Sequence, residues 1–173
     1  SGGGGGGRIA LYAGTMSFLG ATSAAGGPGG SEAGGAGTIF TRLGAEPVGR
    51  LLLDNAGRVG YTHFSSTNWP PDQVFALTLA GSARLALLTP MTVSQFDIST
   101  GAMLTHDRLG QPLRVNVLGT MWVGTGASIN VDGAGYIGNS ANSTNLGPGF
   151  GLVSSLNGCF GGAGYGGEGG RHM

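Results

Sequence analysis

The residues with the types needed for acid–base chemistry gather near the middle of the chain. His106, Asp107 and Arg108 are consecutive, and Asp97 precedes them by one expected turn. Cleavage of a glycosidic bond needs two carboxyl groups at a defined separation. No two carboxylates lie within a few positions of each other on one expected strand, so we interpret these residues as solvated turn residues. A polysaccharide-degrading enzyme is the less favoured alternative, and we expect that the protein is not an enzyme.

No metal or cofactor is expected. The histidines are far apart in the chain and lack the spacing of a zinc site: His63, His106 and His172. Calcium takes six to eight oxygen ligands, of which Asp54-Asn55 and Asn130 to Gly133 supply only fragments. Structural calcium is therefore a weak alternative. The run Gly2 to Gly7 lacks the Gly-Lys-Ser/Thr ending of a phosphate-binding loop, and the chain contains no lysine.

Two positions in the last third of the chain indicate covalent chemistry. Cys159 is the single cysteine, so it has no internal disulfide partner. We expect it to be either a buried small residue beside Phe160 or an intermolecular disulfide between copies. Asn142-Ser143-Thr144 is an acceptor for N-linked glycosylation within a polar stretch. In an exported eukaryotic chain, Asn142 would carry a sugar.

Aromatic residues gather between Leu53 and Val74, which we expect to be the longest non-strand segment of the middle region. Tyr61, Phe64 and Trp69 lie there, and the two prolines after Trp69 disfavour strand pairing. Loops on a rigid scaffold commonly carry binding residues, and aromatic rings stack on the faces of sugars. One hypothesis is therefore contact with surface glycans or a partner. The alternative is a loop that folds back to cover the scaffold.

The composition excludes several classes of protein. Glycine contributes 39 of 173 residues, charged residues make up 9%, and the formal net charge is zero. A nucleic-acid binder needs a basic face, and a charged disordered tail needs a large net charge. Glycine is not at every third position throughout, so the chain is not collagen. No run of 18 apolar residues exists, so no transmembrane helix is expected.

Glycine is concentrated in two flanks. Residues 1–37 hold 15 glycines, residues 133–170 hold 14, and the 95 residues between them hold 10. We therefore expect a single domain, 1–173, with a strand-rich core at 38–132 and glycine-rich flanks at 1–37 and 133–173. Such flanks are flexible linkers in isolation. They become ordered only where backbones pack closely, as at sheet edges, in tight turns or in stacked polyproline-like strands, and the sequence leaves both the ordered and the flexible option open.

The middle region reads as many short strands, which predicts an all-β fold. Each apolar run of four to seven residues is bounded by Gly, Pro, Asn, Asp or Ser, and no window sustains a helical period. The expected strands are 8–12, 38–41, 50–54, 74–79, 83–87, 93–98, 102–105, 113–118, 120–123 and 128–131.

A parallel solenoid is the favoured architecture. Small residues followed by an apolar–x–apolar pair recur at irregular spacing from Gly81 onward, as expected if each coil holds two or three short strands. Stacked coils would bury a shared column of aliphatic side chains. A β-sandwich or barrel is the main competitor. It is disfavoured because hairpin signals are scarce, the best being Asp54 to Gly57 and then Asp132-Gly133.

Several stretches resemble a glycine-rich repeat of very large secreted and surface proteins. These are Gly6-Gly7-Arg8-Ile9-Ala10-Leu11-Tyr12, Gly34-Gly35-Ala36-Gly37-Thr38-Ile39-Phe40, Leu51-Leu52-Leu53-Asp54-Asn55, and the run from Gly126 to Tyr136. They are similar to right-handed parallel β-helix adhesins of the filamentous-haemagglutinin and autotransporter-passenger type. The resemblance implies export, an elongated shape and tandem copies, and it implies no catalytic residue.

The resulting expectation is a structural protein at the cell surface or outside the cell. Its flanks have the same composition, so copies are expected to associate end to end through them, with Gly2, Gly7, Gly162 and Gly167 at the interface. The expected partners are thus copies of the chain itself and, in the alternative, surface glycans. An ice-binding surface is a further alternative, but the threonines do not form an evenly repeated row.

Overall fold

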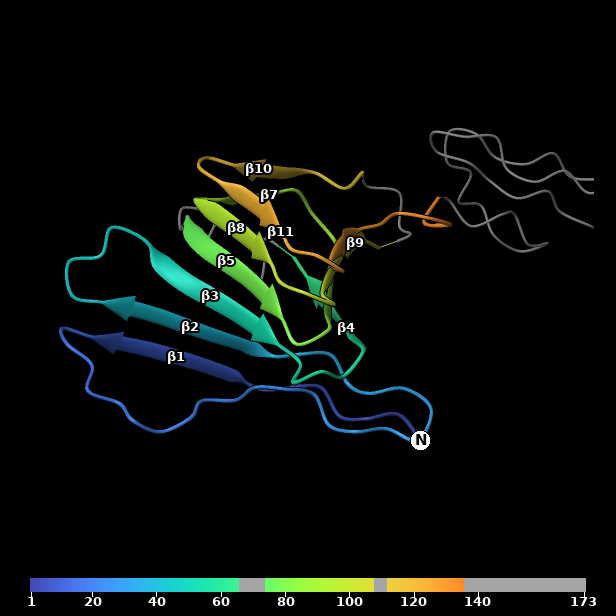
Figure 1. Ribbon diagram of the computed structural model, residues 1–173, viewed down its shortest axis with the longest axis horizontal. Coiled ribbons are helices and arrows are strands. Elements are labelled where there is room, and N and C mark those ends of the chain that lie inside the picture. The colour runs from blue at the N-terminus through green and yellow to red at the C-terminus, as the bar shows by residue number, and fades with distance from the viewer. Residues whose placement is uncertain (66–73, 108–111, 136–173) are drawn as a thin grey trace, which may run out of the picture. The chain divides into compact units, whose positions relative to one another are not determined.

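The structure is a computed structural model in which residues 1–65, 74–107 and 112–135 are described (Figure 1). Every regular element among them is a β-strand, which confirms the all-β prediction. By its contacts the chain divides into two units, 1–105 with 113–130, and 106–112 with 131–173. The features below belong to the first unit, except for His106 and Asp107. Across the described ranges, no helix is long and apolar enough to cross a lipid bilayer.

The largest sheet, here called sheet A, has six strands in the order β1-β2-β3-β5-β8-β11 (Figure 1). Its strands are β1 (Arg8–Ala13), β2 (Thr38–Leu43), β3 (Gly49–Asp54), β5 (Phe75–Ala80), β8 (Gln95–Ile98) and β11 (Met121–Val123). All neighbours pair in parallel except β2 and β3, which are antiparallel.

Two smaller sheets accompany sheet A. Sheet B has the order β12-β9-β6-β4, and sheet C pairs β10 with β7. Their strands are β4 (Gly60–Phe64), β6 (Ala83–Leu87), β9 (Met103–His106), β12 (Ser128–Ile129), β7 (Met91–Val93) and β10 (Val115–Val117). The pairs β4–β6, β9–β12 and β7–β10 are parallel.

A strand–turn–strand unit recurs along the chain and links sheet A to sheet B. It is formed by β3–β4, β5–β6, β8–β9 and β11–β12. Each turn contains a residue with positive φ: Gly57 at 80°, Gly81 at 56°, Gly101 at 78° and Gly126 at 75°. Left-handed backbone is inexpensive only for glycine. Asp54 to Gly57, the best hairpin candidate in the sequence, is not a hairpin, because this turn joins strands of two different sheets.

The core is made of apolar columns that run from strand to strand. Register partners Leu51, Leu77 and Phe96 form one column, and Leu53, Leu79 and Ile98 form another. All six side chains are almost completely buried, and they pack against Leu85 and Leu104 of sheet B. Side chains alternate between the faces of a strand, so the intervening residues form the outer face of sheet A.

Two predicted segments differ from the structure. The segment from 54 to 73 was expected to lack a strand, but Gly60–Phe64 form β4, and Tyr61, Thr62 and His63 carry polar groups in a strand of five residues. The predicted strand 93–98 is two strands, β7 and β8, which belong to sheets C and A and are separated at Ser94. Apolar composition shows that a segment is extended, but it does not show where the chain turns from one sheet to another.

Candidate functional site

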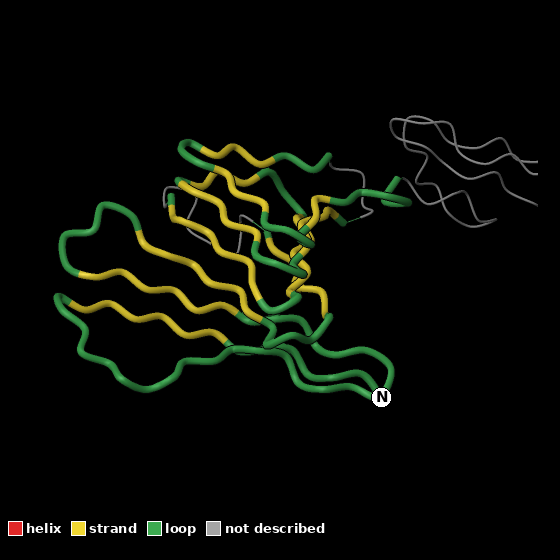
Figure 2. The backbone as a smooth tube through the Cα atoms, viewed as in Figure 1, coloured by secondary structure: helices red, strands yellow, loops and turns green. Residues whose placement is uncertain are grey.

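Glycine-rich segments 1–7, 24–30 and 32–37 form a small bundle, here called the glycine bundle, beside the strand units. Figure 2 shows the three segments side by side near the N-terminus. Backbone hydrogen bonds join them at nearly regular intervals: Gly27 N–H to Gly4 O at 2.8 Å, Gly34 N–H to Gly27 O at 3.0 Å, Gly37 N–H to Ala24 O at 2.7 Å, and Gly6 N–H to Gly35 O at 2.9 Å. The glycine flank at the N-terminus is therefore ordered by its own backbone.

Close packing, and not an unusual backbone angle, requires glycine inside this bundle. None of its glycines has a positive φ. A Cβ on Gly3 would overlap the carbonyl oxygen of Gly27, and one on Gly6 would overlap that of Ala24. Equivalent overlaps occur at Gly26, Gly29, Gly34 and Gly37, so the contacts recur every third residue. This period is that of a polyproline II helix, which is one of the settings that the sequence left open for an ordered flank.

Asn55 fastens the glycine bundle to the strand units. Its side chain is completely buried, at 0% exposure. The Nδ2 group donates to Gly34 O at 3.0 Å and to Arg58 O at 2.8 Å, and Oδ1 accepts from Gly26 N–H at 2.8 Å. All three hydrogen bonds of the amide are thus made to backbone groups. The sequence indicates only a turn residue or a fragment of a calcium site at Asn55, because partners this distant in sequence leave no local signal.

The outward faces of the first segment are open. Among residues 1–65, 74–107 and 112–135, no atom lies within 4 Å of the place where a Cβ of Gly2, Gly4, Gly5 or Gly7 would stand. With a period of three, Gly2 and Gly5 share one face, and Gly4 and Gly7 share the other. We call these the open glycine faces. The predicted interface residues Gly2 and Gly7 lie one on each face, whereas Gly162 and Gly167 lie outside the described residues.

The aromatic residues proposed for glycan contact separate in the structure. Phe64 is 8% exposed and belongs to the core cluster, so its ring is not available to a ligand. Tyr61 is 39% exposed on β4, and the guanidinium of Arg84 lies 5.2 Å from its ring centroid. Arg84 also donates a hydrogen bond to the Tyr61 hydroxyl at 3.0 Å. Trp69 lies outside the described residues, so its role stays a prediction.

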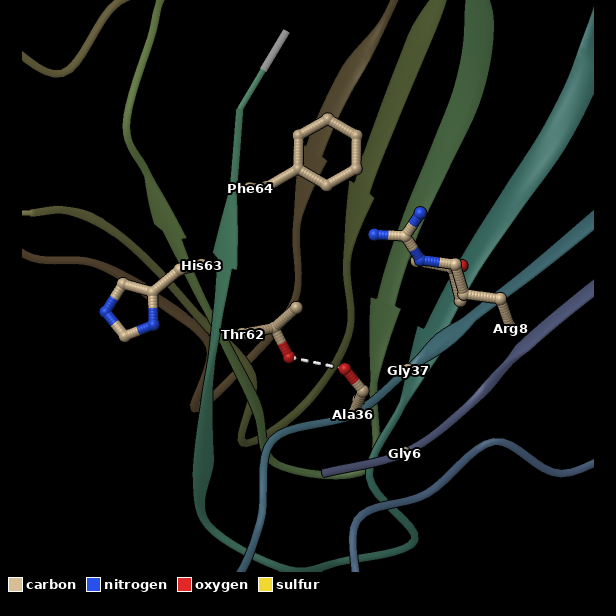
Figure 3. Close-up of a pocket in the computed structure, with 8 residues that line it drawn as sticks. Gly6, Arg8, Ala36, Gly37, Thr62, His63 and Phe64 are labelled. Atoms are coloured by element: carbon tan, nitrogen blue, oxygen red, sulfur yellow. Dashed lines mark hydrogen bonds between the residues drawn. The ribbon is translucent and has the colours of Figure 1, made fainter. Parts of the chain in front are cut away.

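A small hollow lies between β1 and β4. Figure 3 shows Arg8 and Phe64 beside it, with His63 pointing to the other side of β4. The Thr62 hydroxyl donates to Ala36 O at 2.6 Å, which ties β4 to the glycine bundle. The volume of the hollow is about 150 Å³, whereas sites for small organic ligands have volumes of about 300–1,000 Å³. The hollow is therefore suited to a few water molecules and not to a substrate.

The candidate residues for acid–base chemistry are not assembled in the described residues. Asp97 is on the outer face of sheet A, because its neighbours Phe96 and Ile98 are in the core. His106 ends β9 of sheet B, where its Nδ1 lies 2.7 Å from Asp107 O. Arg108, Asn142 and Cys159 lie outside the described ranges. Within those ranges, no three His, Cys, Asp or Glu side chains group as metal ligands would.

Comparisons with known proteins leave the family open. No protein-family model matches the chain, and it matches neither a curated protein nor a solved structure.

Proposed function

We propose that the protein is a structural unit of an extracellular or cell-surface assembly. In this proposal it is a right-handed parallel β-helix whose copies associate through their glycine-rich flanks. The partners are then copies of the chain itself, and neither catalysis nor a cofactor is required. A chain with few charged residues and a formal net charge of zero suits a scaffold that has to persist outside the cell.

The order of the strands supports a coiled path. In the first unit the chain runs from sheet A through a positive-φ turn to sheet B, and from β6 it continues to β7 of sheet C. It then returns to sheet A one strand further along, as β8 lies in parallel beside β5. Parallel strands of one sheet are joined by right-handed connections in almost all proteins. Repetition of this path would give a right-handed helix of strands with the apolar columns inside.

The open glycine faces carry the proposal for assembly. Glycine is costly to order, and it lowers stability wherever alanine would fit. Gly3 and Gly6 are explained by the backbones that approach them, but Gly2, Gly4, Gly5 and Gly7 have open space. Glycine at these four positions is explained if a further backbone approaches as closely as Gly27 approaches Gly3. A second copy of the chain would supply glycine-rich segments of the right kind.

Association of the full chain tests the proposal. We expect sedimentation velocity to show species that grow with protein concentration, and electron microscopy to show rods or fibres of constant width. The same measurements with a reducing agent separate the two kinds of contact. Assembly that disappears on reduction would assign the contact to Cys159 and would contradict association through glycine. A chain that stays monomeric at millimolar concentration would also contradict the proposal.

A further inference from the structure

We infer that the outer face of sheet A carries a binding site for a neutral oligosaccharide. A groove of about 460 Å³ crosses strands β3, β5 and β8 there. This volume is within the usual range for ligand sites, in contrast to the hollow beside Phe64. The groove lies on sheet A of a single copy, so the inference does not depend on association between copies.

Register places the polar lining of the groove in two rows across the strands. Arg50 on β3, Ala76 on β5 and Gln95 on β8 are successive partners and form the first row. Thr78 and Asp97 are partners in the second row. Ala76 is the smallest side chain of the set and lies between Arg50 and Gln95, which accounts for the depth of the groove at this point. A sheet surface thus presents a guanidinium, a carboxamide, a carboxylate and a hydroxyl around an apolar floor.

One wall of the groove is held in place before any ligand arrives. Glu46, Pro47 and Val48 come from the loop between β2 and β3 and line the groove. Glu46 accepts from Arg50 at 3.2 Å and from the backbone N–H of Leu43 at 3.4 Å. This ion pair links the guanidinium to the wall of the groove, and 72% of the Arg50 side chain stays exposed. Preorganised polar groups lose less entropy when they bind.

The charges exclude anionic ligands. Glu46 and Asp97 contribute two carboxylates, and the only cation among the lining residues, Arg50, is paired with Glu46. The groove therefore has a net negative charge, which repels polyanions such as nucleic acids, uronates and sulfated glycans. A strand-forming peptide would need a sheet edge, whereas the groove lies over the centre of the sheet. Neutral sugars fit, because adjacent hydroxyls both donate to carboxylates and accept from guanidinium and amide groups.

A further observation agrees with a ligand that has an apolar side. Trp122 on β11 is the register partner of Asp97, so it lies on the same face one strand further on. Its indole is 52% exposed. A large exposed ring beside a polar groove offers a surface for the C–H face of a sugar.

Binding by the full chain to defined hexasaccharides tests the inference. The probes are neutral β-1,4-glucan, α-1,4-glucan, β-1,4-mannan and β-1,4-xylan hexamers, with an α-1,4-galacturonan hexamer as the anionic comparison. We expect at least one neutral hexamer to bind in calorimetry, with protein NMR shifts at Gln95 and Asp97. Loss of a hydrogen bond to a charged group costs about 1.5–3 kcal/mol, so Asp97→Ala should weaken binding about tenfold or more. Ala76→Leu, which fills the floor, and Trp122→Ala should do the same.

The control is Tyr12→Ala, which removes another exposed aromatic residue. Tyr12 lies on the face of sheet A shared with Phe40, whose ring centroid is 5.6 Å away, and it is outside the groove. It should leave the affinity unchanged, and thermal melting should show that all four variants remain folded. The inference is overturned if no neutral hexamer binds or if the uronate hexamer binds more tightly. It is also overturned if binding persists in Ala76→Leu and Asp97→Ala.

Discussion

The side-chain oxygen of Asn55 accepts a hydrogen bond from the backbone N–H of Gly26 at 2.8 Å, across 29 residues of sequence. This bond joins the first turn between sheets A and B to the middle segment of the glycine bundle. The same amide also holds Gly34 O at 3.0 Å. Two of the three segments of the bundle are thus tied to the strand units through one buried side chain.

Replacement of Asn55 by alanine should destabilise the protein strongly. The buried N–H of Gly26 and the carbonyl of Gly34 would lose their side-chain partner. Each buried group left unpaired costs about 1–3 kcal/mol, so we expect a loss of about 2–5 kcal/mol in urea unfolding. The control is Asn116→Ala on the exposed side of β10, which should change stability by less than about 0.5 kcal/mol. Equal effects of the two substitutions would contradict the role of Asn55.

Neighbouring glycines of the N-terminal run should respond in opposite ways. Gly3→Ala forces a Cβ into the backbone of Gly27 and Gly34, so the free energy of unfolding should fall by about 1–3 kcal/mol or more. Gly4→Ala meets open space and should leave the stability of the monomer unchanged or raise it by about 0.4–1 kcal/mol. Urea unfolding at low protein concentration measures both. The packing of the bundle would be disproved if Gly3→Ala were as stable as Gly4→Ala.

The turns between sheets A and B should depend on glycine for a different reason. Gly101 has a φ of 78°, and a Cβ there would be 3.2 Å from Ser82 Oγ. Left-handed backbone costs an L-residue about 1–2 kcal/mol, so Gly101→Ala should lower the melting temperature. Gly14→Ala, at a position with open space and no positive φ, is the matched control and should not. An unchanged melting temperature in Gly101→Ala would mean that this turn does not have the conformation described.

The apolar columns should carry most of the stability. Leu79 has no exposed surface, and Leu→Ala in a packed core costs about 2–5 kcal/mol. Leu118→Ala removes the same atoms from a side chain that is 64% exposed, and it should cost less than about 0.5 kcal/mol. Urea unfolding measures both variants, and because both changes are Leu→Ala, only the burial of the side chain differs between them. A small effect at Leu79 would argue against a shared core.

The sequence indicated where strands lie more reliably than it indicated which strands pair with each other. The run 83–87 was placed at the bounds of β6, because Ala-Arg-Leu-Ala-Leu alternates between turn residues. β4 was missed because Gly60, Thr62 and His63 dilute its apolar pattern, and it is extended through pairing with β6. The parallel arrangement followed from the scarcity of hairpin signals, but the antiparallel contact of β2 with β3 had no such signal.

The sites were harder to predict than the strands, because their residues come from different strands. Composition alone predicts Gly2 and Gly7 at an interface, which stays a prediction, and it does not distinguish them from Gly3 and Gly6, where a Cβ would meet other backbones. The groove was missed because Arg50, Gln95 and Asp97 come from three strands and meet only through register. Local patterns identify extended segments, whereas sites assembled across strands require the order of the sheet.

The most direct test is the association of a variant with alanine on one open glycine face. In Gly2→Ala/Gly5→Ala, both side chains would project into space that is empty in one copy. If a second backbone packs there, the variant should stay folded and associate about tenfold more weakly than the wild type in sedimentation velocity. Gly14→Ala should associate as the wild type does. Undiminished association of the double variant would contradict assembly through this face.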